Sequence, residues 1–310
     1  MKNELTPEQK QLYDAVLKAY ENHRNLSQEE KESLLLDLMS RKYIDLLCDW
    51  AFKHVFGHNE KNLLLLLNDI LPEKIVHIEY EPGEIDRFKG DDKNVIMDVI
   101  CHTDDGRKII VEMQRQDKTD IRNRLYYYAA ALIYKQLTKG LPYSDLMPVY
   151  VICFMNFRLN HEVNKLIYDY QIRESSGELY GNQATILLCE LPRMMKKTRK
   201  KMTPVEIWFD LLQNMTNFAE KPEEYGAKYN PIFESSLQQP IPVSERTNYL
   251  KSMFGDKIQS VLTDEDRQEA FLEGKAEERT ENARRLMALG VNPEIICKAL
   301  GLSAEELAAL

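Results

Sequence analysis

Two short runs of mostly apolar residues stand in the middle of the chain, separated by a tight turn. The runs, 95–103 and 107–114, are rich in valine and isoleucine, and Asp104-Asp105-Gly106 lies between them. An Asp-Gly pair between two such runs is a strong signal for a β-hairpin. With the turn centred on Asp105, side chains alternate between two faces of the hairpin. One face carries Asp98, Ile100, Lys108, Ile110, Glu112 and Gln114, and the other carries Met97, Val99, Cys101, Ile109, Val111 and Met113.

This register sets Asp98 directly opposite Glu112, with Gln114 one step further along the same face. Two acids side by side in a sheet rich in valine and isoleucine repel each other and lose solvation. A divalent cation between them would remove both penalties. The alternative interpretation is a pair of solvent-facing acids on an edge hairpin, which is common in surface sheets.

The rest of the chain alternates predicted helices with predicted strands, which indicates an α/β protein. The segment 221–245 is rich in proline, glycine, asparagine and serine, and it predicts a linker with short helical pieces. A charged helix is predicted at 264–289. The other predicted helices are 7–24, 28–40, 43–56, 59–71, 122–137, 203–218, 293–300 and 303–310, and the other predicted strands are 75–80, 149–157, 165–172 and 184–191.

Asp98, followed on the next strand by Glu112-Met113-Gln114, resembles the D…(D/E)-x-K/Q signature of the PD-(D/E)XK nuclease superfamily. The chain as a whole resembles the recombination-promoting nuclease / putative transposase family within that superfamily, over roughly residues 40–190. The matching segments are Asp49-Trp-Ala-Phe52-Lys53-His-Val-Phe56-Gly57, Arg122-Asn-Arg124-Leu-Tyr126, Gln136, Gly140, Tyr143 and the apolar run from Pro148 to Phe154.

The resemblance implies a restriction-endonuclease-like core, a short mixed sheet of four or five strands flanked by helices. It implies four regions: a helical N-terminal extension (1–40), the nuclease core (41–200), a helical region and linker (201–262), and a charged C-terminal helix with a helix-turn-helix-like tail (263–310). The implied function is Mg²⁺-dependent hydrolysis of DNA phosphodiesters in recombination or transposition, with Mn²⁺ as a substitute metal.

The same resemblance assigns roles to residues of the predicted site. Asp98 and Glu112 are the expected metal ligands. Gln114 stands where the superfamily usually has lysine, and its amide can position a water molecule but carries no charge. Lys53 is our candidate for the missing positive charge, against the alternative that it is merely exposed. Asp49, one helical turn before Lys53, is either a third acid near the metal or an intrahelical ion-pair partner of little consequence.

Candidate nucleic-acid contacts lie further along the chain. Arg124 is expected to contact phosphate or support Glu112, or else to bury its stem and pair with a carboxylate. Lys196, Lys197 and Arg199 belong to the densest basic run, 196–201, which is either a phosphate contact or a solvated loop. Tyr126, Tyr127 and Tyr128 could stack on bases, but three consecutive residues cannot share one helical face, so at least one is core. We expect Gln136 to be structural.

Composition restricts the function further. A net charge of −9 argues against a protein that simply coats nucleic acid, but it allows an enzyme that recruits metal. No apolar run approaches the ~18 residues of a membrane span, and the N-terminal residues do not resemble a signal peptide, so we expect a cytoplasmic protein. Five scattered cysteines are expected to be reduced, without a zinc site.

Alternatives to a DNA nuclease remain open from sequence. One is a non-catalytic DNA-binding or oligomerising protein that retains the nuclease fold, which Gln114 and the acidic net charge favour. Another is a nuclease that acts on RNA, because no residue can be assigned to a 2′-hydroxyl. A homo-oligomer is possible through the helix predicted at 264–289, although its apolar positions are too sparse for a coiled-coil seam.

Overall fold

The computed structural model describes residues 5–20, 26–85, 95–116, 120–159, 163–181, 183–195, 197–261, 283–284, 286–287, 292–303 and 307. The chain divides into two compact units. The first comprises Met1–Glu21 and Lys31–Phe254, and the second comprises Asn22–Glu30 and Gly255–Leu310. The predicted site lies in the first unit.

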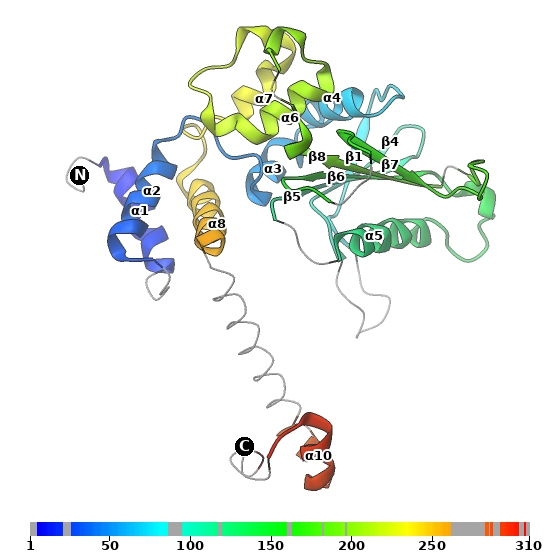
Figure 1. The fold of residues 1–310 in the computed structure, drawn as a ribbon. Coiled ribbons are helices and arrows are strands. Elements are labelled where there is room, and N and C mark those ends of the chain that lie inside the picture. Colours follow the sequence, from blue (N-terminus) through cyan, green and yellow to red (C-terminus); the bar gives the residue numbers. More distant parts are fainter. Residues whose placement is uncertain are drawn as a thin grey trace. The chain divides into compact units, whose positions relative to one another are not determined.

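A six-stranded mixed sheet forms the centre of the first unit (Figure 1). The strands, in spatial order, are β1 (Ile78–Glu81), β4 (Val99–Thr103), β5 (Lys108–Gln114), β6 (Val149–Met155), β8 (Ala184–Glu190) and β7 (Ile167–Gln171). The sequence predicted a sheet of four or five strands, and this prediction is corrected because the observed sheet has six. A separate two-stranded sheet pairs β2 (Glu84–Ile85) with β3 (Val95–Ile96).

Strand direction determines which residues meet at one edge of the sheet. The hairpin strands β4 and β5 are antiparallel, as predicted, whereas β5, β6 and β8 are parallel to one another. Gln114, Met155 and Glu190 therefore stand side by side at the carboxyl ends of three neighbouring strands. Ligand sites of open α/β sheets form at such ends.

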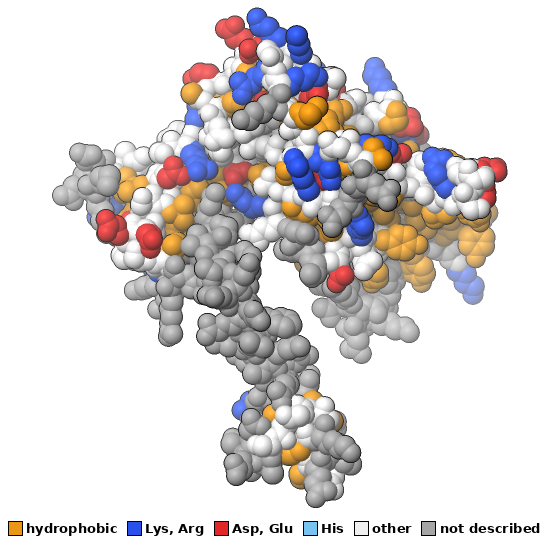
Figure 2. Space-filling model, in the orientation of Figure 1, with side chains coloured by type: hydrophobic (Ala, Val, Ile, Leu, Met, Phe, Trp, Pro, Cys, Tyr) orange, Lys and Arg blue, Asp and Glu red, His pale blue; other side chains and the backbone are white. Residues whose placement is uncertain are grey.

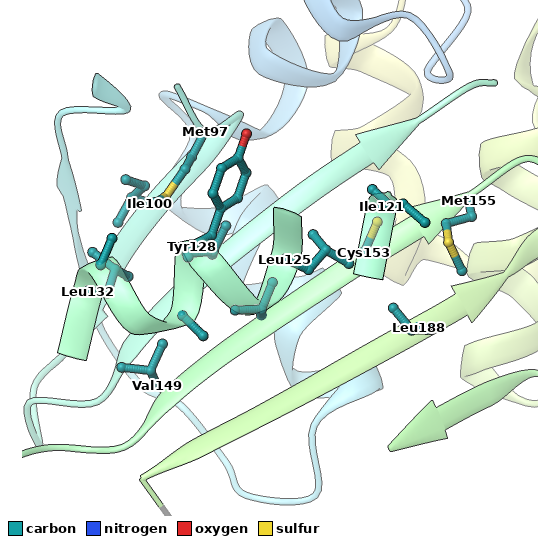
Figure 3. Close-up of a cluster of buried hydrophobic side chains, with 14 of the residues drawn as sticks. Met97, Ile100, Ile121, Leu125, Tyr128, Leu132, Val149, Cys153, Met155 and Leu188 are labelled. Carbon is teal, nitrogen blue, oxygen red and sulfur yellow. The ribbon is translucent and has the colours of Figure 1, made fainter. Parts of the chain in front are cut away.

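Helices cover both faces of the sheet. On one face α5 (Ile121–Lys135) packs on β6 and β8 through a buried apolar cluster that includes Leu125 and Cys153 (Figures 1 and 3). On the other face α3 (Asp49–Phe56) contacts β5, and α4 (Glu60–Ile70) contacts β1. The Phe52 and Phe154 rings lie 6.5 Å apart between α3 and β6. The first unit is therefore an α/β fold of the restriction-endonuclease type.

The segment predicted as a linker, 221–245, is instead packed into the fold. It contains α7 (Asn230–Ser235), and Tyr225, Tyr229 and Phe233 in it are buried. Together with α6 (Pro204–Asn214) this segment covers α3 and α4; for example, the Phe56 and Trp208 rings are 6.0 Å apart. Short 3₁₀ helices also occur between the main elements, at Tyr143–Asp145, Leu191–Arg193, Arg199–Lys201, Met215–Asn217, Glu223–Tyr225 and Ala227–Tyr229.

Three further helices are α1 (Pro7–Ala19), α2 (Gln28–Ser40) and α8 (Val243–Val261). A capping box begins α2, because the Ser27 amide donates to Glu30 and the Glu30 amide donates to the Ser27 hydroxyl. Helix α1 is tied to α8 by an ion pair between Glu8 and Arg246. Helix α1 of the predicted N-terminal extension is thus part of the first unit.

The second unit contains α10 (Pro293–Leu300), which agrees with the predicted helix 293–300. Its apolar side chains form a small cluster centred on Ala283, Ile296 and Leu307. Most of the predicted helices 264–289 and 303–310 lies outside the described residues, and the domain boundaries stay a prediction. No helix in the described part of the chain has the length and apolarity needed to cross a membrane.

Candidate metal and active site

The two predicted metal ligands meet through reciprocal hydrogen bonds. The pairing of Val99 with Val111 and Ile100 with Ile110 confirms the register centred on Asp105. The Asp98 amide donates to Glu112 Oε1 at 3.0 Å, and the Met113 amide donates to Asp98 Oδ2 at 2.8 Å. Each carboxylate is thus fixed to the backbone of the other strand, so their proximity is determined by the hairpin itself.

Asp98 does not lie within a strand, which corrects the strict alternation predicted there. The strand is interrupted at Met97 and Asp98, between β3 and β4. Met97 consequently packs in the same buried cluster as Ile100, although alternation placed them on opposite faces (Figure 3). The Met97 amide donates to the Gly83 carbonyl at 2.9 Å, and a Cβ at residue 83 would lie only 2.7 Å from the Met97 carbonyl oxygen. Glycine therefore permits the close approach that holds this interruption.

Burial and mutual repulsion disfavour the charged forms of both acids. Burial, then the neighbouring Glu112 carboxylate and Asp49, raises the pKa of Asp98 to about 8. Burial raises the pKa of Glu112 to about 7, against the opposing effects of the Asp98 amide, Arg124 and Lys53. Two adjacent carboxyls with raised pKa values are a common sign of a functional site.

Lys53 lies between two acids of the site. Its Nζ is 2.8 Å from Asp49 Oδ1 and 3.3 Å from Asp98 Oδ1. Burial lowers the pKa of Lys53, but the contacts with Asp49 and Asp98 outweigh this effect and the pKa is raised, so the side chain stays charged. The structure thus brings Lys53 and Asp49 to the carboxylate pair. Asp49 is more than half exposed, which leaves Asp98 and Glu112 as the buried acids.

Gln114 extends from the end of β5 on the same side as Glu112. Its Nε2 donates to Glu112 Oε2 at 3.2 Å, so the amide orients one of the two carboxylates. Because the Gln114 amide is neutral, the positive charges near the carboxylates are those of Lys53 and Arg124.

Arg124 lies on α5 close enough to Glu112 to lower the pKa of that carboxyl, and its guanidinium carbon is 6.0 Å from the centre of the Tyr128 ring. Its Nε and Nη2 atoms are buried and have no hydrogen-bond partner among the described residues. Buried guanidinium groups are normally paired, so these two donors suit an anionic partner.

Other residues of α5 divide between core and surface. Tyr128 is buried and donates to the Ile96 carbonyl at 3.1 Å, whereas Tyr126 and Tyr127 are exposed. This confirms that the three tyrosines do not share one face. Gln136 is structural, as expected, because its amide exchanges two hydrogen bonds of 3.0 and 2.8 Å with the backbone of Met147.

Two described residues of the basic run, Lys197 and Arg199, form ion pairs within the chain. Lys197 contacts both carboxylate oxygens of Glu206, at 2.8 and 3.0 Å, and Lys196 lies outside the described residues. Arg199 pairs with Asp210 at 3.1 Å. Figure 2 shows Lys and Arg side chains over the part of the unit where Figure 1 labels α6 and α7, interspersed with acidic ones. A nucleic-acid role for Lys196, Lys197 and Arg199 stays a prediction.

Sequence reasoning did not identify Arg115 and Asp45, which form an ion pair of 2.9 Å beside the site. The available signal was the position of Arg115, directly after the predicted site residue Gln114.

The site fits a magnesium ion by the chemistry of its donors. Mg²⁺ takes one or two protein carboxylates and keeps several waters. Asp98 and Glu112 supply two carboxylates that are already adjacent and are costly to ionise without a cation. In the part of the chain that the structure describes, no group of three or more His, Cys, Asp or Glu is arranged to hold a metal, so the pair itself is the candidate.

The fold and this site define a restriction-endonuclease-like protein. A family model of PD-(D/E)XK nuclease family transposases matches residues 46–254, and the chain belongs to this family. Membership indicates a nuclease or transposition role with DNA as the substrate. Comparison with curated proteins and with solved structures gives no significant match.

Proposed function

We propose that the chain is a Mg²⁺-dependent nuclease that hydrolyses phosphodiester bonds of DNA in the cytoplasm, in recombination or transposition, with Mn²⁺ as a substitute metal. The observation that carries the proposal is the reciprocal Asp98–Glu112 pair, which is buried and has raised pKa values. Such a pair costs stability in a purely structural sheet. The buried free cysteines suit a reducing compartment.

Asp98 and Glu112 would hold the ion. Bound there, Mg²⁺ would polarise the scissile phosphate, ease formation of hydroxide and neutralise the leaving oxygen. Gln114 keeps Glu112 oriented through its 3.2 Å hydrogen bond. Lys53, held by Asp49, supplies a fixed ammonium beside Asp98, in the role that the superfamily's usual lysine would have at residue 114. The two Arg124 donors that have no partner among the described residues suit a phosphate oxygen of the substrate.

The direct test is cleavage of supercoiled plasmid with Mg²⁺, with Mn²⁺ and with chelator. Asp98→Ala and Glu112→Ala should each abolish nicking and keep the fold, because removal of one of two like charges relieves repulsion. Glu79→Gln is the matched control, since it neutralises an exposed acid on the neighbouring strand β1. The proposal fails if both alanine variants cut at the wild-type rate.

A non-catalytic DNA-binding protein is the rival function, and one observation favours it. Gln114 is neutral and its amide is directed to Glu112 rather than to an open position. Binding of labelled DNA without cleavage under any of the metal conditions would establish the rival. The same assay with RNA of matching sequence distinguishes the two nucleic acids.

A further inference from the structure

Arg115 connects the end of strand β5 to the segment before α3 and to α8. It directly follows Gln114, the last residue of β5. Its Nη2 is 2.9 Å from Asp45 Oδ2, and its Nη1 donates to Met253 Sδ of α8 at 3.4 Å. Both members of the ion pair are largely buried, with side-chain exposures of 19% for Arg115 and 10% for Asp45.

Asp45 in turn organises the turn that precedes α3. Its Oδ1 accepts a hydrogen bond from the Leu47 amide at 3.0 Å, and its own amide donates to the Tyr249 hydroxyl of α8 at 3.0 Å. Helix α3 begins four residues after Asp45, at Asp49. The carboxylate of Asp45 is therefore bonded both to the turn before α3 and to Arg115, the residue that follows β5.

Helix α8 extends these contacts along α3. The Trp50 and Tyr249 rings are 5.7 Å apart, and Cys48 Sγ donates to Ser252 Oγ at 3.3 Å. Tyr249 and Met253 of α8 are fully buried against this region. The family model ends at residue 254, so it includes the α8 residues that make these contacts.

The two groups of site residues come from the two elements that this arrangement joins. Glu112 and Gln114 come from β5, whereas Asp49 and Lys53 come from α3. Lys53 reaches Asp98 with a long side chain at 3.3 Å, so a small displacement of α3 would separate them. We infer that Arg115, through Asp45 and α8, is a positioning residue that fixes α3 against β5 and thereby holds Lys53 in the site. The inference rests on the proposed nuclease function.

The test replaces Arg115 by methionine in the full chain and measures single-turnover DNA cleavage with saturating metal. We expect a loss of about 10- to 100-fold in rate, which is the size that a misplacement of about 1 Å produces. Affinity for DNA in Ca²⁺ should change by less than about threefold, because the Arg115 guanidinium is bonded to Asp45 and Met253. Arg115→Lys keeps the charge beside Asp45 and should recover most of the rate.

Hydrogen exchange of backbone amides supplies a readout that does not depend on activity. Arg115→Met should increase exchange in residues 45–56, by about tenfold, without a change in α5. Arg193→Met is the matched control, because Arg193 pairs with buried Glu190 at the end of β8 and donates to the Leu159 carbonyl. It should lower the melting temperature and increase exchange near residues 157–168, while the cleavage rate stays within about threefold.

If Arg115→Met fails to fold, Tyr249→Phe removes only the hydroxyl that accepts from Asp45 and should lower the rate less, in the same direction. A folded Arg115→Met variant with wild-type rate and wild-type exchange in 45–56 overturns the inference. An inactive wild-type protein refutes the proposed function instead, and the exchange experiment then tests the positioning of α3 by itself.

Discussion

Replacement of Asp98 by asparagine should make the metal-free protein more stable at pH 8. Asp98 is buried beside Glu112, and its pKa is raised from 3.8 to about 8. The unfolded chain ionises this carboxyl freely, so the folded state loses stability by resisting ionisation. Asparagine keeps an oxygen that can accept the 2.8 Å hydrogen bond from the Met113 amide and removes the titrating group.

The magnitude follows from the pKa. A pKa raised by about four corresponds to an upper bound of about 6 kcal/mol at pH 8, at about 1.4 kcal/mol for each pKa unit. The two carboxyls titrate as a pair, and the substitution also removes the contact of Asp98 with Lys53. We therefore expect the variant to gain about 2 kcal/mol at pH 8, roughly a third of the bound.

The pH dependence has a defined sign. A carboxyl whose pKa is raised on folding binds more protons in the folded state, so the free energy of unfolding of the wild type falls as the pH rises from about 4 to about 8. The advantage of Asp98→Asn should thus vanish near pH 4 and be largest at pH 8. Magnesium should reverse the order at about 100 times its Kd, because it then stabilises the wild type by about 2.7 kcal/mol.

Urea unfolding at several pH values, with chelator and with Mg²⁺, measures these differences. Asp105→Asn is a suitable control, because the exposed Asp105 has a pKa lowered to about 2 by Arg107 and Thr103, so this substitution should destabilise instead. The reasoning is refuted if metal-free Asp98→Asn is no more stable than the wild type at pH 8, or if Mg²⁺ stabilises both proteins equally.

Two further predictions concern Gln114 and the C-terminal region. Gln114→Ala should weaken cleavage by about tenfold and keep metal binding, because both carboxylates remain. Gln114→Lys should raise the cleavage activity. Loss of metal affinity in the alanine variant, measured by calorimetry, would show that Gln114 is a metal ligand. A chain ending before Thr263 should stay soluble and still cleave plasmid, because residues 263–310 hold 11 acids and 6 bases and are poor at gripping phosphate. A folded, metal-binding truncation that cannot bind DNA would assign DNA binding to the tail.

The hairpin could be predicted in detail because its signals are local. The Asp-Gly turn and the alternation of side chains determine which residues are opposite each other, and the observed register agrees. Alternation failed only at Met97, where the strand is interrupted beside Gly83, a contact between segments that pattern reading does not detect.

Other features depend on contacts between distant parts of the chain and were missed or remained open. Residues 221–245 have the composition of a linker, but Tyr225, Tyr229 and Phe233 are buried where this segment covers α3 and α4. The average composition of the segment does not reveal these aromatic residues, because they are few and spaced apart along the chain. The pairing of Arg115 with Asp45, 70 positions earlier, has no sequence signal beyond the place of the arginine. The proximity of Lys53 to Asp98 likewise depends on how α3 packs on β5.

The candidate site lies at one edge of the sheet, at the carboxyl ends of the three parallel strands, and two turns lie at the opposite edge. Strand β5 has seven residues, so the turn Asp104–Gly106 lies about 20 Å from Gln114. The turn at residues 174–178, after β7, closes on the same remote edge, because β7 runs antiparallel to β8. Fluorophores, affinity tags or whole inserted domains placed in the turn at 174–178, which does not set the register of the hairpin, would leave the carboxylate pair undisturbed. This turn offers an attachment point for following the protein on DNA in single-molecule experiments.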